Sequence, residues 1–126
     1  MKKGVETKKD IKELSFGSTK YKNKRITVNG VKFDSIKEAN RYCDLLLLER
    51  AGEITGLKLQ VPFKLLDSYV RADGKIIRGI TYIADFMYYD KDGKMHVEDV
   101  KGVKTEVYKL KKKLFEKLYG ILLEEI

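Results

Sequence analysis

The chain has little cysteine and little proline, and it has no long apolar run. Of its 126 residues, one is a cysteine and one is a proline. Cys43 therefore cannot form a disulfide within the chain, so a reducing cytoplasmic location is expected. No apolar stretch approaches the length of a membrane span. The Lys2-Lys3 start is not followed by the apolar segment of a signal peptide. We therefore expect no membrane partner.

Several common catalytic and binding motifs are also missing. The sequence contains no glycine-rich phosphate loop, no Walker motif, no nucleophile elbow and no zinc-finger spacing. His96 is the one histidine, and without cysteine or histidine partners it does not favour a zinc site. The candidate functional residues are therefore carboxylates and lysines.

Positive charge is abundant and uneven. The net charge is +8, from 27 basic and 19 acidic residues. Residues 1–25 hold nine basic and three acidic residues, and residues 101–119 hold seven lysines and two glutamates. A basic balance favours polyanion partners through counterion release and electrostatic steering. The alternative is that these lysines are solvated and serve only solubility.

Periodicity and turn residues predict an α/β (α+β) fold. Residues 1–22 lack periodicity and are predicted to be a flexible basic arm, with a single domain over residues 23–126. Asn29-Gly30 predicts a hairpin, because a type I′ turn needs positive φ at both central residues. The order expected after it is helix, three antiparallel strands, helix and a last parallel strand.

Each helix has a predicted buried stripe and predicted ends. Ser35 is expected to open the first helix and Gly52 to end it, while Thr105 and Gly120 bound the second. Helical spacing assigns the buried faces to Ile36, Ala39, Cys43, Leu46 and Leu47 in the first helix, and to Val107, Leu110, Leu114 and Leu118 in the second.

Asp85 stands inside an apolar strand, Ile83-Ala84-Asp85-Phe86, where a charge is costly unless it is paired or bound to metal. Strand alternation puts Asp99 and Lys101 on one face of the next strand. If the two strands pair, the carboxylates of Asp85 and Asp99 converge, and Mg²⁺ suits such oxygen ligands. Lys101 could then orient or deprotonate an attacking water. The alternative is a cross-strand Asp–Lys salt bridge.

Glu38 has two interpretations. Ser35-Ile36-Lys37-Glu38 forms a capping box, in which the Glu38 side chain reaches back to the cap amide. Glu38 could instead point to the sheet edge where the other acids gather. The sequence leaves both interpretations open.

Lysines in and just before the second helix, together with one tyrosine beside them, are candidates for nucleic-acid contacts. They follow Lys101 directly, so phosphate binding is expected next to the predicted metal site. The residues are Lys104, Tyr108, Lys109, Lys112 and Lys113.

In their order, these pieces resemble the PD-(D/E)XK nuclease superfamily. They are Glu38 in a first helix, Asp85 in a strand, Asp99-Val100-Lys101 in the next strand, and a basic helix. The amino-acid sequence also resembles a small phage and prophage family long classed as a domain of unknown function. The resemblance implies a restriction-endonuclease-like mixed sheet, α-β-β-β-α-β, after an N-terminal hairpin. It also implies that Asp85, Asp99 and Glu38 bind metal and that Lys101 assists the water. Ala84-Asp85 replaces the usual Pro-Asp.

The expected function is a phage-type, Mg²⁺-dependent DNA endonuclease that hydrolyses phosphodiester bonds, with Mn²⁺ as a substitute metal. Branched or junction DNA is a candidate substrate, a homodimer is open, and a phage protein would act in the host cytoplasm. The main alternative is a catalytically silent DNA- or RNA-binding module. A structural or protein-binding phage component is a third.

Overall fold

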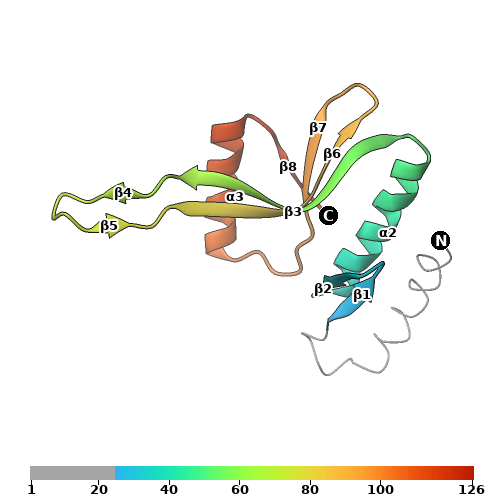
Figure 1. Cartoon of the computed structure of the whole chain (residues 1–126), viewed down its shortest axis with the longest axis horizontal. Coiled ribbons are helices and arrows are strands. Elements are labelled where there is room, and N and C mark those ends of the chain that lie inside the picture. The colour runs from blue at the N-terminus through green and yellow to red at the C-terminus, as the bar shows by residue number, and fades with distance from the viewer. Residues whose placement is uncertain (1–24) are drawn as a thin grey trace. The chain divides into compact units, whose positions relative to one another are not determined.

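A computed structural model describes residues 25–126, which form parts of two compact units (Figure 1). The first unit ends at Glu53 and the second begins at Ile54. The predicted basic arm, residues 1–22, lies outside the described residues. Neither helix in the described part of the chain is long and apolar enough to cross a membrane.

The first unit contains a hairpin followed by a helix. Strands β1 (Ile26–Val28) and β2 (Val31–Phe33) pair antiparallel. Asn29 and Gly30 have φ values of 52° and 80°, which confirms the predicted type I′ turn. Helix α2 (Ile36–Arg50) follows its N-cap Ser35, whose hydroxyl accepts a hydrogen bond from the Glu38 amide at 3.1 Å.

The buried face of α2 differs from the predicted stripe. Ala39 and Cys43 are buried as expected, but Leu47 is 57% exposed, so its assignment to the core was wrong. Tyr42 is buried instead, with its ring centroid 5.1 Å from that of Phe33. Burying the Tyr42 ring against the hairpin stabilises the fold more than burying Leu47 would. The helix therefore turns its Tyr42 side toward the hairpin.

The second unit is built on a four-stranded mixed sheet, in the order β3-β6-β7-β8 (Figure 1). The first two pairings are antiparallel and β7–β8 is parallel. The α+β class and the element order that the sequence predicted are therefore confirmed. The strands are β3 (Ile54–Leu66), β6 (Ile80–Asp90), β7 (Met95–Asp99) and β8 (Leu123–Glu125).

Helix α3 (Glu106–Tyr119) makes the crossover between the two parallel strands. Thr105 is its N-cap and accepts from the Tyr108 amide at 3.1 Å, while Gly120 ends it in the left-handed conformation with φ 68°. Both predicted ends are confirmed. A second hairpin, β4 (Tyr69–Val70) and β5 (Ile76–Ile77), extends from the ends of β3 and β6 (Figure 1).

The predicted apolar stripe of α3 is mostly wrong. Val107, Leu110 and Leu118 are 63%, 59% and 55% exposed, and Leu114 alone of the predicted four is partly buried. Tyr108 and Phe115 are the buried residues of this helix. The Phe115 ring lies 4.9 Å from that of Phe63 and 5.6 Å from that of Tyr82. Packing of these aromatic rings determines which side of the helix faces the sheet.

Candidate functional site

The candidate site lies where strands β6 and β7 stop pairing. Their last paired residues are Phe86 and Glu98. Beyond this pair, one Asp85 carboxylate oxygen accepts a hydrogen bond from the Val100 backbone amide at 2.8 Å. A side chain thus replaces the next ladder contact, and it carries the Asp85 carboxylate to the end of β7.

Asp85 occupies a slip in the alternation of β6. Ala84 and Met87 both belong to the core that faces α3, although strict alternation would put residues three apart on opposite faces. Across from Asp85, Gln60 has a φ of 51°, and its amide nitrogen donates to the other Asp85 oxygen at 3.4 Å. This local irregularity explains how an acidic residue fits within an apolar strand.

Asp99 is almost fully buried, with 1% of its surface exposed. The Tyr82 hydroxyl donates to its Oδ2 at 2.8 Å, and the Lys101 Nζ lies 3.7 Å from the same oxygen. Lys101 Nζ also lies 4.8 Å from the centre of the Tyr108 ring. The structure therefore brings Asp85, Asp99 and Lys101 together, while the neighbouring Glu98 accepts a hydrogen bond from the Tyr88 hydroxyl.

Burial and the adjacent Asp85 carboxyl raise the pKa of Asp99 to about 7. The Tyr82 hydroxyl and the Lys101 ammonium act against this rise but do not cancel it. Burial, together with Asp99, raises the pKa of Tyr82 well above its ordinary value, so this hydroxyl keeps its proton and donates it. Near neutral pH the acid pair therefore retains a proton, unless a cation takes its place.

Glu125 is a residue of this region that the sequence did not single out. It is the register partner of Asp99 in the parallel pair β7–β8. Its carboxylate accepts from the Tyr108 hydroxyl at 2.7 Å and forms ion pairs with Lys104 at 3.1 Å and Lys112 at 3.3 Å. These contacts lower the pKa of Glu125 to about 2. The predicted parallel strand was the one signal that could have indicated it.

The predicted nucleic-acid residues do not form a uniform exposed row. Tyr108 is buried and contacts Glu125, so it supports the site from inside rather than presenting a ring to DNA. Lys104 and Lys112 are paired with Glu125, and Lys109 is paired with Glu106 at 3.3 Å. Lys113 is exposed.

A shallow pocket of about 310 Å³ is lined by Tyr82 and Lys101, the two residues that contact Asp99 Oδ2. Lys111, which the sequence did not single out, reaches across it, and its Nζ donates to the Thr81 carbonyl at 3.1 Å. The pocket thus has two lysines, Lys101 and Lys111, in its wall. Its lining residues are Thr81, Tyr82, Ile83, Lys101, Thr105, Val107, Tyr108 and Lys111.

The two-carboxylate arrangement limits the kind of metal that these residues could hold. In residues 25–126, no group of three or more histidine, cysteine, aspartate or glutamate side chains is arranged to hold a metal ion. Mg²⁺ is commonly held by one or two carboxylates and keeps several waters, so a pair of adjacent carboxylates meets its requirements. The donor chemistry of Asp85 and Asp99 therefore fits this ion and does not fit a structural zinc.

Glu38 and His96 have surroundings of their own. Glu38 is in the first turn of α2, in the first unit, and its role as a metal ligand stays a prediction. His96 is held by Glu124 at 2.6 Å and Asp90 at 2.8 Å and stacks on Tyr88. Asp90 and Glu124 raise the pKa of His96, and the residue links β7 to its two neighbouring strands, β6 and β8.

Comparison with known proteins gives the family of the chain without a function. No curated protein and no solved structure matches it. A family model described as "Protein of unknown function (DUF1064)" matches residues 18–124, which include most of both described units and the residues Glu38, Asp85, Asp99 and Lys101. The chain therefore belongs to the DUF1064 family.

Proposed function

We propose that this protein is a Mg²⁺-dependent DNA endonuclease of the phage type. The observation that carries the proposal is the acid pair, in which the buried Asp99 lies beside the partly buried Asp85 and 3.7 Å from the Lys101 ammonium. Burying the Asp99 carboxylate next to a second carboxylate costs free energy that a structural role does not require. Binding of a divalent cation between the two carboxylates would account for this cost, because the cation offsets their repulsion.

Asp85 and Asp99 would hold the ion, with Glu38 as the further ligand that the family resemblance implies. Bound Mg²⁺ supplies Lewis-acid activation of water and neutralises charge on the phosphate. The Val100 amide and Gln60 hold Asp85 in place, and Tyr82 does the same for Asp99. Both carboxylates therefore have an orientation prepared by the fold before any ion arrives.

Lys101 has a separate role. Its ammonium is held between the Asp99 carboxylate and the Tyr108 ring, and it lines the shallow pocket. From there it can orient the attacking water or stabilise the negative charge that develops on the phosphoryl oxygens. In metal-assisted phosphodiester hydrolysis, the two acids would hold the metal ion and the lysine would act on the water or the phosphate.

DNA as the partner is supported by the net charge of +8 and by Lys111 in the wall of the pocket. Two further features resemble PD-(D/E)XK nucleases. One is the order of the residues Glu38, Asp85 and Asp99-Val100-Lys101, and the other is the order of the elements, namely hairpin, helix, three strands, helix and strand. Junction or branched DNA, action in the host cytoplasm and a homodimeric assembly are parts of the same proposal.

A catalytically silent DNA- or RNA-binding module is the second candidate. The observation that favours it is the pairing of Lys104 and Lys112 with Glu125, which shows that acids near this site can serve to organise lysines. On this alternative, Asp99 and Lys101 would form a structural ion pair only.

The test is incubation of supercoiled, linear and four-way-junction DNA with the protein in Mg²⁺, Mn²⁺ or EDTA. The decisive variant is Asp85→Asn, because asparagine can still accept from the Val100 amide but lacks the charge. Asp92→Asn, in the exposed turn between β6 and β7, is the matched control. We expect metal-dependent cleavage by the wild type and the control, and none by Asp85→Asn. Absence of cleavage by the wild type, with DNA binding unchanged in Asp85→Asn, would favour the silent module.

A further inference from the structure

The hairpin between β3 and β6 is an ordered ribbon, and we call residues 66–80 the β-arm. Its two strands pair in register, with Tyr69 opposite Ile77 and Val70 opposite Ile76. The tip is closed by a hydrogen bond from the Arg71 amide to the Lys75 carbonyl at 2.7 Å. Arg71 also binds both oxygens of Asp73, at 3.0 and 2.6 Å. The β-arm is thus a projecting hairpin that is stabilised by its own hydrogen bonds and ion pair.

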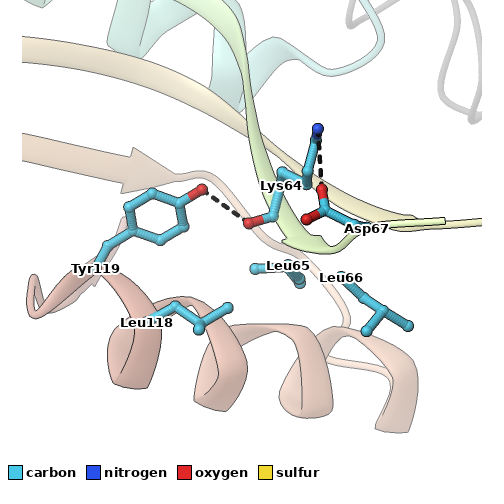
Figure 2. A pocket seen from close by; sticks show the side chains of 6 residues that line it. All are labelled: Lys64, Leu65, Leu66, Asp67, Leu118 and Tyr119. Carbon is cyan, nitrogen blue, oxygen red and sulfur yellow. Dashed lines mark hydrogen bonds and ion pairs between the residues drawn. The ribbon is translucent and has the colours of Figure 1, made fainter. Parts of the chain in front are cut away.

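The base of the β-arm is held closely to the sheet and to α3. A side chain at Gly79 would bring a Cβ within 2.4 Å of the Leu66 carbonyl oxygen, so glycine is required for the two strands to approach. The Tyr119 hydroxyl of α3 donates to the Lys64 carbonyl at 2.7 Å, beside a pocket of about 290 Å³ that Leu65, Leu66 and Leu118 border (Figure 2). These contacts fix where the β-arm starts.

The β-arm exposes apolar side chains that contribute little to the core. Val70 and Ile76 are 67% and 78% exposed and form one cross-strand pair. Tyr69 is also exposed and pairs with Ile77, on the other face by strand alternation. Apolar side chains gathered on a projecting ribbon indicate a surface that meets a partner.

The charges of the β-arm indicate what kind of partner this is. Arg71 is neutralised by Asp73, and Asp67 is neutralised by Lys64. In the described part of the chain, Lys75 and Arg78 form no ion pair, and both are exposed. Two copies of the β-arm would bring these cations together and repel each other, whereas a polyanion would be attracted to both.

The β-arm is also continuous with the candidate site. Its second strand runs into β6, which carries Asp85 only five positions after Ile80, a span of about 17 Å in extended chain. Thr81 and Ile83, between them, line the pocket that contains Lys101 and Lys111. The second strand of the β-arm therefore continues along β6 to the pocket that contains Lys101 and Lys111.

We propose that the β-arm binds double-stranded DNA as a ribbon in a groove of the duplex, a groove wide enough to admit two antiparallel strands. Lys75 and Arg78 contact phosphates, and the Val70–Ile76 pair contacts base edges. The choice of DNA as the polyanion rests on the proposed nuclease function. On this view, the β-arm positions the duplex segment whose phosphodiester reaches Asp85 and Asp99.

The test measures affinity for a duplex against salt concentration, in EDTA so that no cleavage occurs. Lys75→Ala and Arg78→Ala should each weaken binding and lower the slope of log affinity against log salt by about 0.9, the value for one phosphate contact on duplex DNA. Lys94→Ala, in the exposed turn between β6 and β7, is the matched control and should leave the slope unchanged. If the slope of log affinity against log salt in Lys75→Ala and Arg78→Ala equals that of the wild type, the proposal is overturned.

A second measurement locates the DNA directly. Cys43 is buried and is the one cysteine of the chain, so Ala72→Cys at the exposed tip of the β-arm gives a single accessible thiol for a photo-cross-linker. We expect cross-links to duplex DNA. Two results together would overturn DNA binding and assign the β-arm to self-association. They are the absence of such cross-links, and dimers of the wild type that dissociate in the double variant Val70→Ser/Ile76→Ser.

The outcomes also separate this inference from the proposed function. A reduced slope in Lys75→Ala without any cleavage by the wild type would support the β-arm and reject the nuclease. Metal-dependent cleavage with unchanged slopes would support the nuclease and reject the β-arm.

Discussion

The carboxylate of Asp85 is bound to the backbone amide of Val100, the residue between Asp99 and Lys101. One hydrogen bond thus holds Asp85 next to both candidate partners, within two strands joined by a short turn. Because this contact replaces a ladder bond, the strands separate at the point where a substrate phosphate would need room.

The free energy of unfolding should depend on the protonation of Asp99. The pKa of Asp99 in the folded protein is about 7, above its ordinary 3.8, so the native state holds a proton that the unfolded chain releases. The stabilising contribution is complete below the ordinary pKa and is lost as the pH rises through about 7. Metal-free protein should therefore lose stability across this window.

Urea denaturation in EDTA, compared between the wild type and Asp99→Asn, isolates this effect because other groups titrate alike in both. The variant should gain stability relative to the wild type as pH rises, and added Mg²⁺ should stabilise the wild type above neutral pH. Parallel pH profiles for the two proteins would contradict the assignment of the raised pKa.

Lys101→Ala should separate chemistry from metal binding. Removing a preorganised cation of this kind costs on the order of 10²–10³ in rate. Because the positive charge next to Asp99 is also removed, Mg²⁺ affinity should be retained or improved. Single-turnover cleavage and calorimetric metal titration measure the two effects. A loss of metal affinity that accounts for the whole rate defect would contradict a role for Lys101 in the reaction.

Glu38 and Ser35 can be distinguished by paired variants. Ser35→Ala removes the hydroxyl that caps α2 and should cost about 1 kcal/mol of stability with little effect on cleavage. Glu38→Gln can still complete a capping box but lacks the charge of a metal ligand. We expect Glu38→Gln to unfold like the wild type and to cleave poorly. Normal cleavage by this variant would reduce Glu38 to a helix cap.

Glu125→Gln should strengthen DNA binding. The variant keeps an acceptor for the Tyr108 hydroxyl but releases Lys104 and Lys112 from a carboxylate. The freed lysines should raise duplex affinity in EDTA and steepen its salt dependence, because a nearby negative charge has been removed. Affinity that stays the same in Glu125→Gln would mean that neither lysine lies near the bound phosphates.

The sequence predicted those features that depend on local chemistry. Asn29-Gly30, Ser35, Thr105 and Gly120 each act through the conformation or hydrogen bonds of neighbouring residues, and all four behave as predicted. Alternation likewise placed Asp99 beside Lys101, because the two are only two positions apart in an extended segment.

Features that depend on packing were missed. The buried sides of α2 and α3 are determined by the contacts of Tyr42 and Phe115 with distant rings, which helical spacing does not reveal. Gln60 was missed because its contact with Asp85 needs a slip in the alternation. Glu125 was missed because its contacts need the register of a parallel pair, which forms only after the crossover helix has folded.

That parallel pair also sets an order of events in folding. The β6–β7 hairpin can form from adjacent segments, with both carboxylates still in water. The Asp99 carbonyl accepts from the Ile126 amide at 3.0 Å, a contact that closes only when α3 has crossed back over the sheet. We therefore expect the arrival of α3 and β8 to be the step that removes Asp99 from solvent, and uptake of its proton to belong to that late step. If the proposed ion binds there, refolding at alkaline pH without divalent ions should slow at this step, and the ion would assist folding before it takes part in any reaction.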